Sequence, residues 1–170
     1  MNITSAQLRQ PGFHGEINRP LQRHRLANGQ LNLEVTEGSL VEDLEGAARI
    51  MQRLRELSVT FSIDDFGTGF SSLSYLRRMP IQVLKIERSF VKSVPDNADD
   101  MKLVRSIVSM AHGLELKVVA EGVETERQLL SSVGSDQVQG HVFSPPHAGD
   151  SPWAKPRTGA SLERPGVESA

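Results

Sequence analysis

Strand-like apolar runs recur along this chain, and each one ends at or near a polar residue. The run at 59–63, Val-Thr-Phe-Ser-Ile, leads directly into Asp64 and Asp65, and a Gly-Thr-Gly loop follows. Amphipathic helical patterns separate the runs, with the clearest ones over 41–57 and 98–114. This alternation of strand and helix predicts an α/β fold with a parallel sheet covered by helices.

Polar residues mark the predicted strand ends, and in chain order they are Asn2, Glu34, Asp64, Lys85, Glu121 and Gln139. The carboxyl ends of parallel strands meet at one edge of a sheet, where active sites of α/β proteins lie. We therefore expect these side chains to converge. Their spacing averages near one βα unit of a (β/α)₈ barrel, ~30 residues.

Chain length leaves two architectures open. A complete (β/α)₈ barrel takes ~250 residues, and this chain has 170. The segment 147–170 is rich in Pro, Gly and Ser, so we expect it to be a disordered tail. The remainder supplies about six βα units. The fold is then either an open doubly wound sheet or a barrel without its first two units.

The candidate site residues are oxygen donors and one lysine, which favours a hard divalent cation such as Mg²⁺ or Mn²⁺. Each residue also has a simpler interpretation. An Asp-Asp pair before glycine is common in turns, and a lysine in an apolar strand commonly reaches solvent at a sheet edge. Glu121 and Glu124 are candidates to cap a helix that starts near Thr125. Taken singly, Asn2 and Gln139 fit structural roles.

Composition narrows the function classes. The net charge of −2 supplies no basic field for a nucleic-acid polymer or an anionic membrane. The sequence has no cysteine, which excludes disulfides and thiolate metal sites. No run approaches the ~20 apolar residues of a membrane helix, and the first residues lack a secretion-signal pattern. We expect a cytoplasmic protein.

Three longer motifs carry a family resemblance. DDFGTGFSSLSYLRRMPIQVLKIERSFV, VVAEGVET and VQGHVFSPP together resemble the EAL-domain family of cyclic di-GMP phosphodiesterases, and LEVTE at 33–37 is similar to a preceding family segment. The resemblance spans residues 1–146 and is specific as a joint pattern. It implies a TIM-like (β/α) barrel that hydrolyses cyclic di-GMP to linear pGpG with two Mg²⁺ or Mn²⁺ ions.

The resemblance also assigns expected roles. The implied metal ligands are Asn2, Glu34, Asp64, Asp65 and Glu121. Lys85 is implied to position the attacking water and the phosphate, so the expected catalytic set is Lys85, Glu121, Asp64 and Asp65. Supporting roles fall to Gln139 behind the ligands, Glu124 as a second acid of the site and Glu37 as the residue that steadies the loop after the Asp pair.

The sequence also departs from the family pattern. The Glu-Ala-Leu signature is absent, and Glu87 stands where the family usually has aspartate. We expect an incomplete barrel whose first strands, one metal ligand and a phosphate-binding arginine are missing, with weak or no activity. The alternative is a catalytically degenerate remnant that binds cyclic di-GMP or a protein partner. A homodimer contact on the outside of the 98–114 helix and an upstream sensory or GGDEF domain are further candidates.

Overall fold

The computed structural model describes residues 1–41, 43–67, 73–131 and 134–143. One parallel sheet holds six strands in the spatial order β1-β2-β3-β4-β5-β6. The strands are β1 (Asn2–Ile3), β2 (Asn32–Thr36), β3 (Thr60–Phe66), β4 (Val83–Ile86), β5 (Lys117–Glu121) and β6 (Gln137–Gln139). Because spatial order follows sequence order, the sheet has barrel-type connectivity, and the doubly wound alternative, whose strand order reverses, is wrong.

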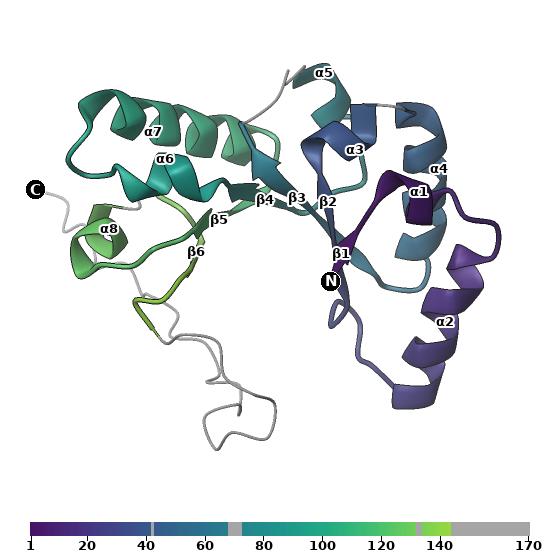
Figure 1. Cartoon of the computed structure of the whole chain (residues 1–170). Helices are drawn as coiled ribbons and strands as arrows, with labels where there is room; N and C mark the ends of the chain where they lie inside the picture. Colours follow the sequence, from purple (N-terminus) through teal and green to yellow (C-terminus); the bar gives the residue numbers. More distant parts are fainter. Residues whose placement is uncertain (42, 68–72, 132–133, 144–170) are drawn as a thin grey trace, which may run out of the picture.

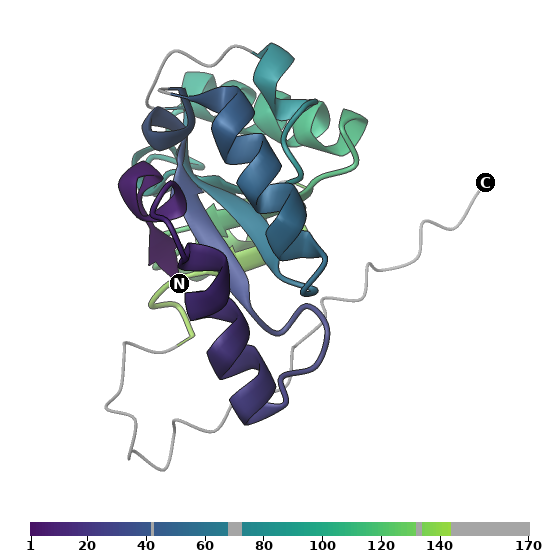
Figure 2. The ribbon, with the colours of Figure 1, turned by 90° about the vertical axis from the view of Figure 1, so that its right-hand side faces the viewer.

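Eight helices connect or follow these strands within the described residues. They are α1 (Ser5–Leu8), α2 (Phe13–His24), α3 (Glu37–Val41), α4 (Leu44–Arg55), α5 (Leu73–Leu76), α6 (Arg88–Lys92), α7 (Ala98–Gly113) and α8 (Glu126–Ser131). Figure 1 shows α1, α2 and α4 grouped beside β1 to β3, with α6 and α7 grouped beside β4 and β5. Figure 2, turned by 90°, shows α2 and α4 lying alongside the strands.

Side-chain alternation gives the sheet two different faces. Register partners share a face, and Ile63, Leu84 and Val118 form one such row across β3, β4 and β5. These three side chains are fully buried, as are Phe61 and Val35 on the same face. Helix residues such as Met51 and Leu54 complete this core. We call this side the apolar face.

The opposite side, which we call the polar face, carries the other half of each strand. Its register pairs include Glu34 with Ser62, Thr36 with Asp64, and Glu121 with Gln139. The alternate residues of each strand that point to the polar face therefore bring acids from distant parts of the chain onto one surface.

Most predicted elements are confirmed, with differences at their ends. β3 continues through the Asp pair to Phe66 instead of ending at Ile63, and β6 ends at Gln139. Pro20 lies inside α2. The short helices α3 and α6 were not predicted. The tail predicted over 147–170 lies outside the described residues.

Within the part of the chain that the structure describes, every helix is too short or too polar to cross a lipid bilayer.

Candidate metal centre

Lys85 stands at the centre of the candidate site. It lies on β4, an interior strand between β3 and β5, and is only 7% exposed. Its Nζ atom is 3.0 Å from Glu34 Oε2, 3.2 Å from Asp64 Oδ1 and 2.5 Å from Glu121 Oε1. Each of these acids comes from a different strand. Because Lys85 lies buried on an interior strand, the interpretation of it as a lysine that reaches solvent at a sheet edge is wrong. We call Glu34, Asp64, Asp65, Lys85 and Glu121 the acidic cluster.

A bulge in β3 explains how two adjacent acids serve one site. Neighbouring residues of a regular strand point to opposite faces. Here Ile63 pairs with Leu84 and Phe66 pairs with Ile86, so β3 spans three steps where β4 spans two. Asp65 takes up the difference with a left-handed backbone, φ 55°, a conformation that Asp tolerates better than most residues.

The bulge brings carboxylate oxygens together. One oxygen from each of Asp64, Asp65 and Glu121 lies within 4.8 Å of the other two. Oxygen atoms at this spacing, without sulfur or histidine nitrogen among them, suit a hard divalent cation. The donor set therefore fits a hard divalent cation, and Asp64, Asp65 and Glu121 are the residues that would hold it.

The electrostatics of the acidic cluster leave an excess of negative charge, since four carboxylates surround one ammonium group. Burial alone would lower the pKa of Lys85, but hydrogen bonds to Glu121 and Glu34 and the nearby charges outweigh it and raise the pKa. Burial raises the pKa of Glu121 despite its bond to Lys85. Burial, followed by the charges of Asp64 and Glu87, also raises the pKa of Asp65. A cation would relieve this repulsion.

Asn2 and Gln139 lie beside the acidic cluster by register. Asn2 is the β1 partner of Glu34, and Gln139 is the β6 partner of Glu121. Both side chains are exposed on the polar face. Their contact with a metal or its ligands stays a prediction.

Glu37 begins α3 directly after β2 and is almost fully buried, at 2% exposure. Its Oε2 atom accepts a hydrogen bond from the Gly67 backbone N–H at 3.4 Å, which ties α3 to the end of β3. Burial, followed by the Glu37 charge, raises the pKa of the Tyr75 phenol in α5. This contact with Gly67 is of the kind that the family resemblance implies, and its effect on function stays a prediction.

Glu124 turns to an arginine instead of the acidic cluster: its Oε1 atom is 2.5 Å from Arg88 Nη2. The start of α8 is capped by other groups. Gln128 N–H donates to Thr125 Oγ1, and Gln128 Oε1 accepts from the Glu124 backbone N–H. The interpretation of Glu121 and Glu124 as side-chain caps for this helix is therefore wrong, whereas the role of Glu124 in the site stays a prediction.

Sequence reasoning missed the polar layer beneath the acids. Ser62, which is 2% exposed, donates from Oγ to Asn32 Oδ1 at 2.6 Å, and Asn32 Nδ2 donates to Thr60 Oγ1 at 3.1 Å. The sequence could have indicated this layer, because these polar residues occupy alternate positions of the predicted strands, on the same face as Glu34 and Asp64. They fill this face with satisfied polar groups below the carboxylates.

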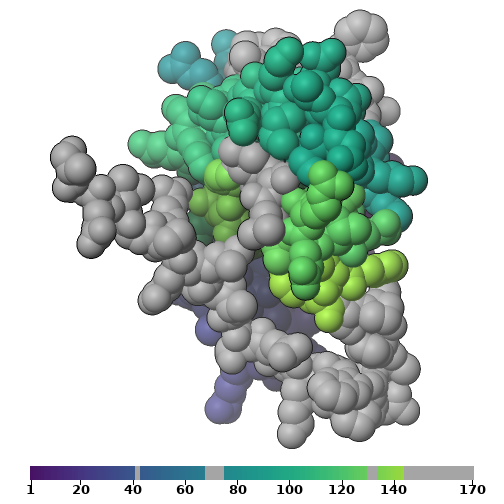
Figure 3. Space-filling view, turned by 90° about the vertical axis from the view of Figure 1, so that its left-hand side faces the viewer, coloured from purple at the N-terminus to yellow at the C-terminus, as the bar shows by residue number. Residues whose placement is uncertain are grey.

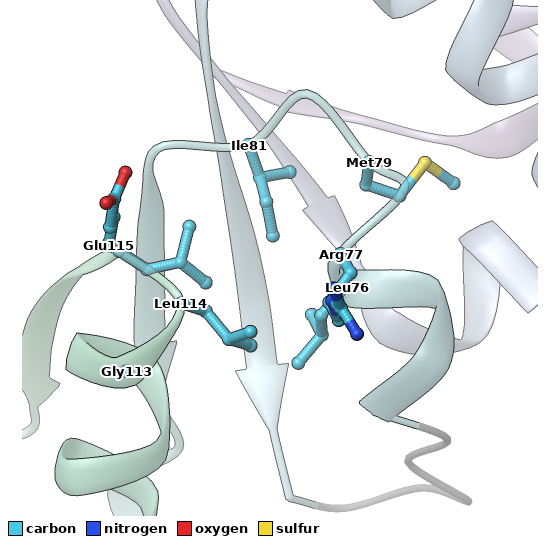
Figure 4. Close-up of a pocket in the computed structure, with 8 residues that line it drawn as sticks. Leu76, Arg77, Met79, Ile81, Gly113, Leu114 and Glu115 are labelled. Carbon is cyan, nitrogen blue, oxygen red and sulfur yellow. The ribbon is translucent and has the colours of Figure 1, made fainter.

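A separate hollow of about 390 Å³ lies at the other end of the strands. It is lined by Leu76, Arg77, Met79, Ile81 and residues 113–116, and Figure 4 shows Ile81, Met79 and Leu114 around it. Ile81 and Leu116 precede β4 and β5, which places the hollow at the amino ends of the strands. It does not belong to the metal centre, which lies at their carboxyl ends.

Comparison with known proteins shows the family of the chain and its fold. A family model described as EAL domain matches residues 1–146. The cyclic di-GMP phosphodiesterase NbdA of Pseudomonas aeruginosa is 45% identical over 148 residues, which cover 86% of this chain and 19% of that protein. The chain spans about a fifth of the length of the curated relatives it matches.

Two solved structures are similar over most of the chain. The EAL domain of Mycobacterium smegmatis DcpA superposes with a TM-score of 0.82 at 38% identity, covering 87% of this chain and 67% of that one. The PaMucR phosphodiesterase in complex with c-di-GMP gives a TM-score of 0.80 at 39% identity, covering 85% and 65%.

Proposed function

The chain belongs to the EAL domain family, and on that premise we propose that it hydrolyses cyclic di-GMP to linear pGpG at the acidic cluster, with two Mg²⁺ or Mn²⁺ ions. The fold is the TIM-like barrel type of EAL domains. The observation that carries the proposal is the convergence of carboxylates from β2, β3 and β5 around Lys85 at the carboxyl edge of the sheet.

The candidate metal ligands form two groups, one on β3 and β5 and one on β1 and β2. Asp64, Asp65 and Glu121 offer clustered oxygens for one ion, and Glu34 with its neighbour Asn2 extends the donor set along β2 and β1. Bound divalent cations supply charge neutralisation of the phosphodiester and activation of the attacking water. The bulge at Asp65 fixes the direction of two ligands before any ion binds, which lowers the cost of assembling the site.

Lys85 supplies a fixed positive charge where the reaction builds negative charge. The attacking water gives up one proton as its oxygen adds to phosphorus in line with the leaving O3′, the P–O3′ bond breaks, and O3′ takes up a proton, which leaves a 5′-phosphate and a 3′-hydroxyl. The three N–H donors of Lys85 Nζ face Glu34, Asp64 and Glu121. Bound cations would take up these carboxylates, and a donor released in this way to a non-bridging phosphate oxygen or to the attacking water would stabilise the transition state. The raised pKa of Lys85 keeps it charged at neutral pH.

A cyclic di-GMP-binding module without turnover is the second candidate. The arrangement of Lys85 favours it, because the ammonium group contacts Glu34 and Glu121 without a metal and offsets part of their negative charge. Homodimer formation, an upstream sensory or GGDEF domain and a cytoplasmic location stay predictions.

Hydrolysis of cyclic di-GMP by the purified chain with Mn²⁺, followed by chromatography of pGpG, tests the proposal. Asp65→Asn should abolish turnover, whereas Asp96→Asn, at an exposed ion pair with Arg127, should leave it unchanged. Circular dichroism shows whether each protein is folded. Equal turnover in wild type and Asp65→Asn would contradict the proposal, and binding without turnover in the folded wild type would favour the second candidate.

A further inference from the structure

The two ends of the sheet carry opposite charge. The acidic cluster lies at the carboxyl ends of the strands, whereas the connections from each helix into the next strand lie at the amino ends, since the strands are parallel. These connections, together with the last turns of α2 and α4, are rich in cations. The cations are Arg23, Arg25, Arg53, Arg55, Arg77, Arg78 and Lys117. We call the surface that they form the basic end.

Backbone hydrogen bonds join these connections into one surface. The Gly29 N–H donates to Ser58 O at 2.9 Å, which ties the connection before β2 to the one before β3. The Phe61 N–H donates to Gln82 Oε1 at 2.8 Å, and the Lys117 N–H donates to Gln82 O at 2.9 Å. The residues before β2, β3, β4 and β5 therefore lie side by side, and their cations share one end of the molecule.

Positive charge is in excess at the basic end. Its cations are exposed, and within the described part of the chain none of them makes an ion pair or a side-chain hydrogen bond. The acids of the same connections are fewer: Glu56, Glu115 and Asp136. Asp136 is already engaged by His112 and by the Val118 backbone N–H. The net charge of −2 hides this excess, because other acids gather at the carboxyl ends of the strands.

Apolar groups lie among these cations. Leu26 directly follows Arg25 and is 42% exposed, which few large apolar side chains of the described residues are. The hollow of about 390 Å³ belongs to the same surface, and Figure 4 shows Arg77 and Glu115 on opposite sides of it with Leu114 between them. Basic residues beside exposed apolar ones are typical of surfaces that bind the interface of a membrane.

We propose that the basic end docks on the surface of an anionic lipid bilayer, an interaction that goes beyond the proposed function and does not depend on it. Guanidinium groups pair with the phosphates of lipid headgroups in bidentate geometry, and Leu26 enters the boundary of the acyl chains. The opposite charges of the two ends orient the docked molecule. Anionic lipid attracts the basic end and repels the acidic cluster, so the candidate metal centre faces the aqueous phase.

A nucleic-acid polymer is the other polyanion that a basic surface can bind. Single strands are held by stacking on aromatic side chains, and the connections of the basic end carry none over 23–31, 53–59, 77–82, 113–117 and 134–136. Leu26 favours the bilayer over a duplex, because an exposed leucine gains nothing from a phosphate backbone and gains free energy on leaving water.

Co-sedimentation of the full chain with vesicles of phosphatidylglycerol and phosphatidylcholine in equal parts tests this, with pure phosphatidylcholine vesicles as the reference. The wild type should bind only the anionic vesicles, and less so at high salt because the charges are screened. The double variant Arg53→Gln/Arg55→Gln should weaken binding about twentyfold, since each basic residue near an anionic surface contributes about fivefold.

A charge-matched double variant is the control. Arg105→Gln/Arg127→Gln removes the same net charge from exposed positions on α7 and α8. Figure 3 shows the surface that these two helices form with α6. This variant should bind the vesicles nearly as the wild type does. Equal losses in the two double variants would overturn the proposal, because they would show a response to net charge and not to the basic end.

Leu26→Ser separates the bilayer from other polyanions. It should weaken binding to the anionic vesicles severalfold, because it removes the apolar anchor, and it should leave retention on heparin unchanged. Circular dichroism shows whether each variant is folded, and salt titration of the wild type needs no variant. A folded wild type that does not bind the anionic vesicles, or that binds a random-sequence DNA duplex more tightly, would overturn the bilayer assignment. Hydrolysis of cyclic di-GMP in solution tests the proposed function separately.

Discussion

The two faces of the sheet are built from the same strands and obey different requirements. On β3, Phe61 and Ile63 are fully buried on the apolar face, whereas Ser62 and Asp64 lie on the polar face. The apolar face gains free energy by removing hydrocarbon from water. The polar face gathers four carboxylates around one lysine and raises the pKa values of Asp65 and Glu121. In one strand, the residues that point to the apolar face thus stabilise the fold, and the alternate residues that point to the polar face form the candidate site.

This difference indicates what each face needs from its surroundings. The apolar face is completed by helices of the same chain, with Met51 and Leu54 of α4 in its core. The polar face carries excess negative charge that the described residues balance only in part, through Lys85. A divalent cation is the complement that its donor set fits.

The largest expected effect is on the apolar face. Phe61→Ala should lower the free energy of unfolding by about 3–5 kcal/mol, because it removes a fully buried ring and leaves a cavity. The adjacent Ser62→Ala removes one hydrogen bond and should cost only about 1 kcal/mol. Urea unfolding measures both changes. Similar losses for the two variants would contradict the distinction between the faces.

Lys85→Met tests the polar face at an intermediate magnitude. Without metal it should lower the free energy of unfolding by about 1–3 kcal/mol, since it leaves carboxylates that are 15–25% exposed without their counter-ion. Saturating Mn²⁺ should recover part of this loss. Lys102→Met, at an exposed ion pair of α7, should change stability by less than about 0.5 kcal/mol. A Lys85→Met protein that is as stable as wild type in EDTA would refute the role of Lys85 as internal counter-ion.

Asp136 gives the smallest effect and shows how an acid behaves away from the acidic cluster. Burial favours its neutral form, but the Val118 backbone N–H at 2.8 Å and His112 Nε2 at 2.9 Å outweigh burial and lower the pKa. A pKa that is lower in the native state stabilises the fold at pH values above the pKa of the unfolded state, 3.8. This stabilisation is lost as the pH falls through the native pKa.

Asp136→Asn should therefore lower the free energy of unfolding by about 1 kcal/mol or less at pH 7, because the side chain is 36% exposed. The difference in free energy of unfolding between the variant and the wild type should disappear in acid. Urea unfolding of both proteins at pH 7 and below the unfolded pKa measures it, with Asp99→Asn as an exposed control. A gap that widens on acidification would have the wrong sign for this account.

The sequence predicted the architecture because apolar residues recur at alternate positions, as in Phe61 and Ile63. It also predicted that Glu34, Asp64, Lys85 and Glu121 converge, since strand ends share an edge. The bulge at Asp65 was missed because it depends on how β3 aligns with β4, which no local pattern encodes. The same limit applies to Arg88, whose side chain packs where a Cβ atom at Gly122 would lie, and α3 and α6 are too short for a helical period.

Calorimetric titration of the metal-free chain with Mn²⁺ tests the central claim, that the polar face is a metal centre. The wild type should bind Mn²⁺, and Asp64→Asn should weaken the affinity about tenfold or more, because it removes a ligand. Asp96→Asn should bind as the wild type does. Binding that Asp64→Asn leaves unchanged, or a folded wild type that binds no Mn²⁺, would contradict the account.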